Sequence, residues 1–115
     1  MDIEKLRQLC LELPFSTEDL KWGHDICFCI GEKMYCVTSA DIPMSVSLKV
    51  SDEDFEALTE REGIVPAPYL ARHKWVLVQG PQYLSETEWE HLVKQSYQLV
   101  KAKLPKKTRQ QLGGE

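Results

Sequence analysis

The sequence predicts an α+β fold, a two-layer sandwich in which a mostly antiparallel sheet packs on helices. Apolar residues recur at helical spacing near the N-terminus and again over residues 85–104, but they alternate with period two between residues 19 and 50. The connections between the early strand-like runs are too short for parallel crossovers. The expected order is helix, three or four strands, helix, at least one more strand, helix.

The first helix is predicted from Asp2 to Leu13. Asp2 suits the N-cap position, and Pro14 ends the helix because the residue before a proline avoids the α region. The apolar positions share one face, which needs a surface to pack on: Ile3, Leu6, Leu9, Cys10 and Leu13.

Period-two alternation then predicts strands at residues 19–24, 26–30, 34–39 and 45–50. In the first strand, Leu20, Trp22 and His24 share a face. The loop at residues 31–33 has two or three residues, and this open choice leaves the face of Cys36 undecided. In the last strand Lys49 points outward, as Lys21 does in the first. One buried face and one wet face are typical of an antiparallel sheet.

Helix signals recur in the second half of the chain. Ser51 is an expected N-cap, and Gly63 is the expected C-cap of the helix that follows it. An extended, proline-containing segment at residues 64–72 leads into a strand at 74–79. The last helix begins with a capping box at Ser85 and ends before Pro105.

Size and composition indicate one folded domain over residues 1–109, followed by a flexible tail at 110–115. A chain of 115 residues with 43% hydrophobic residues is large enough for a real core. No apolar run approaches the roughly 20 residues that span a bilayer, and the N-terminus lacks the apolar centre of a signal peptide. We expect a cytoplasmic monomer that does not contact a membrane.

Residues that usually carry catalysis or bind metals are present without a recognisable pattern. Cys27 and Cys29 form a C-x-C pair, but no second pair follows at zinc spacing. In the cytoplasm the four cysteines are expected as reduced, mostly buried thiols. His24, His73 and His91 have no partner at catalytic spacing, and no nucleophile or phosphate-loop motif occurs. The sequence therefore predicts a binding protein without metal, cofactor or catalytic residues.

Charge is distributed unevenly along the chain. The net charge is −4, which argues against a general nucleic-acid binder. Residues 1–100 hold nine basic and seventeen acidic residues, a net charge of −8, whereas residues 101–109 hold five basic residues and no acid. One end of the chain is thus strongly positive on an otherwise acidic molecule.

Three strings resemble the MmcQ/YjbR family: EDLKWGHDICFCIGEKMYCV at residues 18–37, PAPYLARHKWV at 66–76 and KLPKK at 103–107. The resemblance extends over roughly residues 3–109. It implies a two-layer sandwich of the kind also seen in type III secretion chaperones, with no catalytic residues, metal or cofactor. Members are commonly named DNA-binding proteins because of a proposed double-wing arrangement of hairpins. This chain departs from similar ones in its cysteine-rich strand pair and in His73, where an aromatic residue is common.

The leading functional hypothesis is weak, salt-dependent binding of double-stranded DNA through a local basic patch, which requires the cationic C-terminal stretch to lie beside residues 72–75. The candidate contact residues are Lys33, Arg72, Lys74, Lys103, Lys106, Lys107 and Arg109. One alternative is a protein- or peptide-binding sheet face with Tyr35, Val37, Tyr69 and Trp75 near it. Another is a small-molecule pocket between sheet and helices, lined by Cys27 and Cys29.

Overall fold

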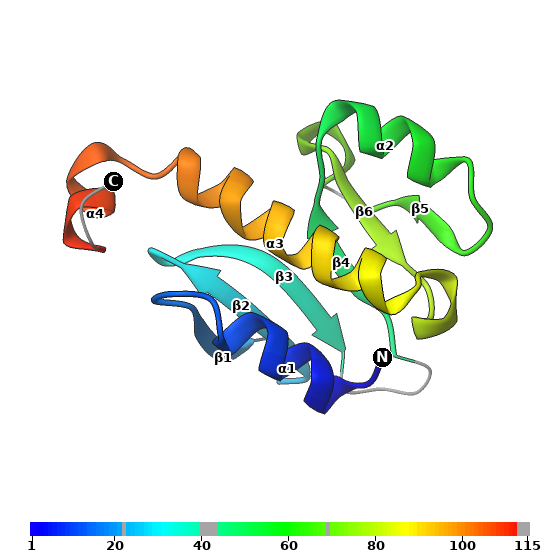
Figure 1. Ribbon diagram of the computed structural model, residues 1–115, viewed down its shortest axis with the longest axis horizontal. Helices are drawn as coiled ribbons and strands as arrows, with labels where there is room; N and C mark the ends of the chain where they lie inside the picture. Colours follow the sequence, from blue (N-terminus) through cyan, green and yellow to red (C-terminus); the bar gives the residue numbers. More distant parts are fainter. Residues whose placement is uncertain (22, 40–43, 69, 113–115) are drawn as a thin grey trace.

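The computed structural model describes residues 1–21, 23–39, 44–68 and 70–112 (Figure 1). The helices are α1 (Ile3–Leu11), α2 (Asp52–Thr59), α3 (Glu86–Ala102) and α4 (Lys106–Gln111), with short 3₁₀ turns η1 (Ala71–His73) and η2 (Pro81–Tyr83). The strands are β1 (Thr17–Lys21), β2 (Asp25–Ile30), β3 (Lys33–Ser39), β4 (Val46–Lys49), β5 (Ile64–Pro66) and β6 (Trp75–Val78).

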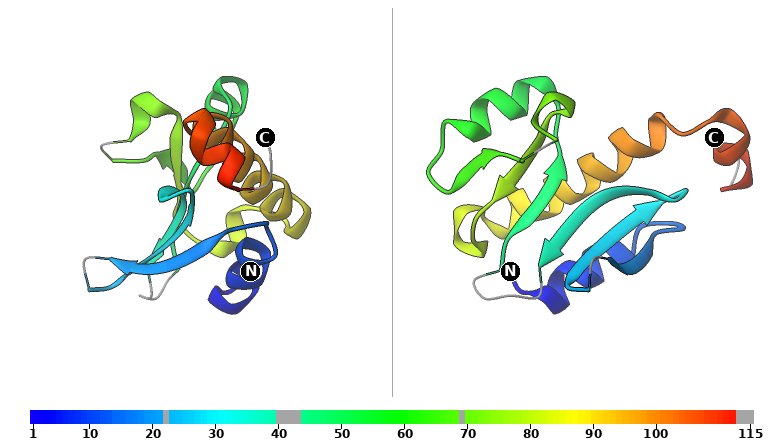
Figure 2. Two further views of the ribbon diagram at one scale, coloured as in Figure 1. Left: turned by 90° about the vertical axis from the view of Figure 1, so that its left-hand side faces the viewer. Right: turned by 180° about the vertical axis from the view of Figure 1, so that it is seen from behind.

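The six strands form one sheet in the order β1-β2-β3-β4-β6-β5, and each neighbouring pair is antiparallel. Helices α1 and α3 lie on one face of this sheet, and α2 packs on β5 and β6 (Figures 1 and 2). We call the opposite face, which no long helix covers, the open face. The α+β sandwich predicted from the sequence is confirmed, and the proline-containing segment forms an edge strand as the missing amide proton of proline requires.

The core lies between the sheet and the helices. Alternation along the strands points Phe28, Leu48 and Val76 toward the helices, and these three side chains are fully buried. Helix α3 contributes the largest share of the helical side, with six buried residues: Trp89, Leu92, Val93, Ser96, Tyr97 and Val100. The capping box at its start and the N-caps Asp2 and Ser51 form as predicted.

A β-bulge at Tyr35 decides the register that the sequence left open. Phe28 pairs with Cys36 and Cys29 pairs with Met34, so β3 holds one extra residue opposite β2. The hairpin turn itself has two residues, Gly31 and Glu32, both at positive φ. Because of the bulge, Tyr35 and Cys36 are consecutive in sequence yet both belong to the core under the helices.

The buried hydroxyl of Ser96 connects β3 and β4 at the point where the hydrogen-bonded pairing of these two strands ends. The last paired residues are Cys36 and Leu48, and beyond them the two strands diverge. The Lys49 amide donates to Ser96 Oγ at 2.9 Å, and the Ser96 hydroxyl donates to the Tyr35 carbonyl. Ser96 on α3, which is fully buried, therefore supplies the hydrogen bonds that a neighbouring strand would otherwise supply.

Several boundaries differ from the expected ones. Helix α1 ends two residues early, α2 ends at Thr59 rather than near Gly63, and β1 begins at Thr17. The stretch after Pro105 is a short helix instead of an irregular end, and the expected domain boundary at 109 falls inside it. Residues 110 and 111 complete α4 and Leu112 packs on the core, while Trp22 and residues 113–115 lie outside the described part.

Candidate functional site

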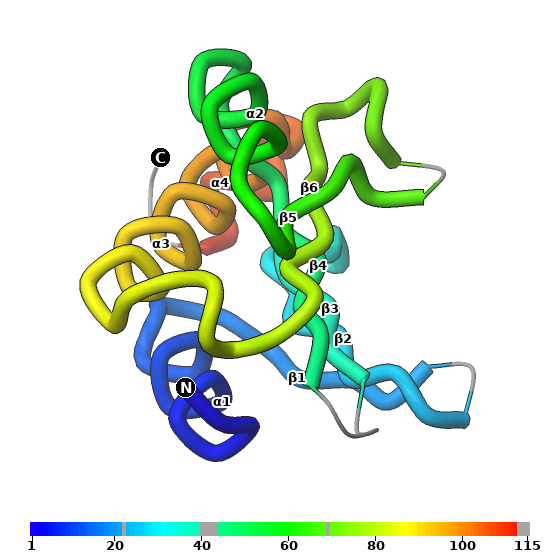
Figure 3. The backbone as a smooth tube through the Cα atoms, turned by 90° about the vertical axis from the view of Figure 1, so that its right-hand side faces the viewer, coloured from blue at the N-terminus to red at the C-terminus, as the bar shows by residue number. Residues whose placement is uncertain are grey.

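Two loops project from the open face of the sheet. One is the β1–β2 hairpin, and the other is the connection from β5 to β6, which contains η1. Viewed along the sheet, both extend away from the helices (Figures 2 and 3). We refer to these two loops as the projections; residues 22 and 69 within them lie outside the description.

A hollow of about 600 Å³ lies between the projections, where the open face meets the end of α3. Side chains from five separate stretches of the chain line it. The lining residues are Lys21, Glu32, Lys33, Met34, Lys49, Leu70, His73, Trp75, Val100 and Lys103. Four of these ten are lysines and one is an acid, on a chain whose net charge is −4. We call this feature the lysine hollow.

The electrostatics of the lysine hollow centre on Lys49 and Lys103. The Lys49 ammonium donates a hydrogen bond to the His73 carbonyl, which holds it against the second projection. Burial lowers the pKa of Lys49 and the positive charge of Lys103 lowers it further, while Asp52 acts in the opposite direction. Two cations thus repel each other across a partly desolvated space, an arrangement that a bound anion would stabilise.

Apolar side chains form much of the remaining wall. Trp75 is 6% exposed, so it is mostly covered, whereas Met34 and Leu70 are half-buried and reach the hollow. The His73 side chain is exposed at the rim. The hollow therefore combines cations with apolar surface and differs from a purely solvated group of lysines.

Only two of the seven predicted contact residues, Lys33 and Lys103, line the lysine hollow. Arg72 is exposed on η1 without reaching it. Lys74 adopts the left-handed conformation with φ 63°, and its ammonium lies 5.0 Å from the centroid of the Phe55 ring. This cation–π contact directs Lys74 toward α2.

Lys106, Lys107 and Arg109 lie on α4. The side chains of Leu104, just before this helix, and of Thr108, within it, both pack against Gly31 in the β2–β3 turn. The packing is close, because a Cβ at Gly31 would stand 2.8 Å from the Leu104 side chain. Lys106 and Lys107 are exposed, and the buried Nε of Arg109 has no hydrogen-bond partner among the described residues. Of the C-terminal basic residues, only Lys103 thus lines the same hollow as residues of the second projection. The hairpin that carries Lys33 is packed at its turn and does not project freely.

The sequence did not single out the residues that complete the site. Lys21 and Lys49 were expected only as outward positions in the sheet, and His73 as a solvated side chain. They join Lys103 in one place because β1, β4, η1 and α3 converge there. This convergence could not be predicted from residue spacing, because Lys21 and Lys103 are far apart along the chain.

Of the residues expected near the exposed sheet face, Val37 and Trp75 do belong to the open face by their strand pairing, but Tyr35 does not. Tyr35 is fully buried under the helices, where its ring meets that of Tyr97 edge to face with centroids 5.5 Å apart. The bulge causes this difference. Trp75 is mostly covered, Val37 is half-buried, and Tyr69 lies outside the described residues.

The cysteines are buried and unpaired, but their places differ from the expected pocket. Cys27 and Cys29 flank core-facing Phe28 on the strand, so they point to the open face instead of the space between sheet and helices. Burial raises the pKa of both thiols. Across residues 1–21, 23–39, 44–68 and 70–112, no three histidine, cysteine or acidic side chains gather where they could hold a metal ion.

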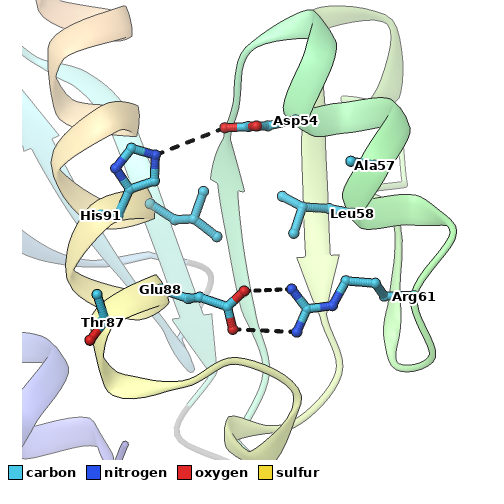
Figure 4. A pocket seen from close by; sticks show the side chains of 8 residues that line it. Asp54, Ala57, Leu58, Arg61, Thr87, Glu88 and His91 are labelled. Carbon is cyan, nitrogen blue, oxygen red and sulfur yellow. Dashed lines mark hydrogen bonds and ion pairs between the residues drawn. The ribbon is translucent and has the colours of Figure 1, made fainter.

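A second hollow, of about 390 Å³, lies between α2 and α3 (Figure 4). Arg61 spans its rim and binds Glu88 through two hydrogen bonds of 2.6 and 3.3 Å. This contact, with the backbone bond at the helix start, lowers the pKa of Glu88 to about 2. His91 Nε2 lies 4.0 Å from Asp54 Oδ2 on the same rim. The Arg61–Glu88 ion pair thus joins the segment that follows α2 to the first turn of α3.

Acidic residues concentrate on the helices. Residues 52–62 hold six acids and one base, and the start of α3 adds Glu86, Glu88 and Glu90. The acids of α2 and of the first turn of α3 are thus separate in the fold from the lysine hollow, which α3 reaches only with its last turn. Asp19 and Asp25 stand beside Lys21 on the β1–β2 hairpin. None of the described helices is both long and apolar enough to cross a bilayer.

These features define a small α+β domain with one antiparallel sheet, helices on one face and a lysine-lined hollow on the other. The chain belongs to the YjbR family, whose model matches residues 11–99. It is similar to the crystal structure of a Deinococcus radiodurans protein with a DUF419 domain, at 30% identity and a TM-score of 0.87, covering 98% of this chain and 88% of that one. A Pseudomonas syringae protein shares the fold at 24% identity and a TM-score of 0.70, covering 86% of this chain and 98% of that one. No curated protein matches the chain.

Proposed function

We propose that this YjbR-family domain binds nucleic acid through its sugar-phosphate backbone, with the lysine hollow as the contact site. The carrying observation is that four lysines from four different elements line one hollow that has a single acid among its lining residues, on a chain of net charge −4. Phosphates need fixed cations, and Lys49 is fixed by its bond to the His73 carbonyl. We propose that the role is binding rather than catalysis.

A structural role explains only part of this arrangement. Lys103 caps the C-terminal end of α3, where a cation is favourable beside the negative end of the helix dipole. That effect gives no reason for Lys21, Lys33 and Lys49 to converge on the same hollow, because like charges brought together cost free energy. A polyanionic ligand offsets this repulsion.

The test is fluorescence anisotropy of a labelled oligonucleotide as the salt concentration rises. With about four phosphates neutralised, the slope of log affinity against log salt is about −3 to −4, a loss on the order of 100-fold between about 50 and 200 mM. The double variant Lys49→Gln/Lys103→Gln should make this slope shallower by about 2 and weaken binding at low salt.

The matched control is Lys5→Gln/Lys94→Gln. It removes the same charge from exposed lysines of α1 and α3, and position 94 lies half a helical turn away from position 103 around α3. Binding that ignores salt, or an equal loss in both double variants, contradicts the proposal.

A further inference from the structure

We infer that the lysine hollow receives an unpaired nucleotide, so that the preferred ligand is a single strand rather than a duplex. The inference rests on the proposed function and adds the strand state of the ligand. Two observations carry it: the cations surround a recess, and the recess has an apolar wall beside an exposed imidazole.

The first observation concerns the shape of the site. Lys21 comes from the β1–β2 projection, Lys49 is held against the β5–β6 projection and Lys103 comes from the end of α3, so the three surround the hollow. A duplex presents its phosphates on the outside of a wide, stiff cylinder. Such a surface is best met by cations along a ridge or on an element that enters a groove. A flexible single strand can bend into a recess and bring one phosphate close to all three ammonium groups.

The second observation concerns the wall. Met34 and Leu70 are half-buried and contribute apolar surface to a hollow that also contains cations. In a duplex the faces of the bases are stacked on each other, so this wall would meet only sugar and phosphate. An unpaired base offers an apolar face, and stacking of a base on a side-chain ring contributes about 1–3 kcal/mol.

His73 is the residue placed to make that contact. Its side chain is exposed at the rim, while its backbone carbonyl, not its ring, binds Lys49. The imidazole is therefore available for a base without disturbing the lysine that binds the phosphate. The substitution His73→Ala keeps the carbonyl and should leave the lysine geometry intact.

The experiment compares three labelled probes at about 50 mM salt: an oligothymidylate of about 12 nucleotides, a duplex of equal length, and a single strand of abasic sites. We expect the oligothymidylate to bind at least about tenfold more tightly than either of the others. His73→Ala should lower its affinity about tenfold and leave duplex and abasic binding unchanged. His91→Ala removes an exposed histidine outside the lysine hollow and is the matched control.

Each other outcome has a distinct meaning. Equal affinity for single strand and duplex, with both weakened by Lys49→Gln/Lys103→Gln, overturns the single-strand inference and supports backbone binding. Equal affinity for the oligothymidylate and the abasic strand overturns the base contact. Failure of all three probes to bind, or binding that the lysine double variant does not change, overturns the proposed function itself.

Discussion

Replacing Ser96 with alanine should be one of the most damaging small changes in the chain. The Ser96 hydroxyl accepts from the Lys49 amide and donates to the Tyr35 carbonyl, and the residue is fully buried. Ser96→Ala leaves both backbone groups without this partner. Each buried unsatisfied group costs about 1–3 kcal/mol, so the expected loss for the two groups is about 2–6 kcal/mol. A domain of this size has a free energy of unfolding of roughly 5–15 kcal/mol.

Equilibrium urea unfolding, followed by tryptophan fluorescence, measures this loss. With a slope of about 2 kcal/mol per molar urea, in the middle of the usual range, the midpoint should fall by about 1–3 M. Ser47→Ala is the matched control because Ser47 lies on β4 with its side chain on the opposite face of the sheet from Leu48, and it should change stability by less than about 0.5 kcal/mol. If the two variants unfold at the same midpoint, the Ser96 bridge does not join β3 to β4 as described.

Three further predictions concern a glycine, an ion pair and the thiols. In urea unfolding, Gly63→Ala should lower the free energy of unfolding by roughly 1–3 kcal/mol more than Gly23→Ala does. Both glycines have φ near +80°, but a Cβ at Gly63 would stand 2.3 Å from the Tyr83 ring, whereas nothing lies within 4 Å of a Cβ at Gly23. The folded-state pKa of Glu88, about 2, lies below its ordinary 4.5, so its pairing with Arg61 stabilises the protein above pH 4.5 and is lost as the pH falls toward 2. Glu88→Gln should remove less than about 1 kcal/mol of the change in unfolding free energy between pH 4.5 and pH 2, because the Arg61 and Glu88 side chains are both partly exposed. An unchanged dependence of stability on pH would contradict the pairing. In a thiol-labelling assay at mildly alkaline pH, the native protein should react slowly and the urea-unfolded protein fast. The reason is that burial contributes to the raised pKa of Cys27, Cys29 and Cys36. Fast labelling of the native protein would refute this expectation.

Local patterns predicted most of the fold because they act over a few residues. The Ser85 capping box and the alternation of Val46 and Leu48 each depend on close neighbours, and both appear as expected. The bulge at Tyr35 could not be predicted in this way. It depends on how β2 and β3 pair, and it reverses the face of an aromatic residue that simple alternation had placed on the outside.

The candidate site was less predictable than the fold. The cluster of basic residues after position 100 suggested that the C-terminal end would dominate, yet α4 turns Lys106 and Lys107 toward solvent and only Lys103 reaches the hollow. Nothing in the local sequence distinguishes Lys49 from the other thirteen of the fourteen basic residues. Its environment depends on His73 and Lys103, which reach it only through tertiary packing.

Charge is placed unevenly in the fold, with acids on α2 and the start of α3 and lysines in the hollow, and this placement bears on the arrival of the proposed ligand. Under the proposed function, an approaching polyanion is repelled by the acids of α2 and the start of α3 and attracted by the lysines between the projections. With such a ligand, the protein would be steered by its uneven charge toward encounters in which the hollow faces the polyanion. Its association rate should fall as added salt shortens the screening length to about 10 Å or less, even though its total charge is negative.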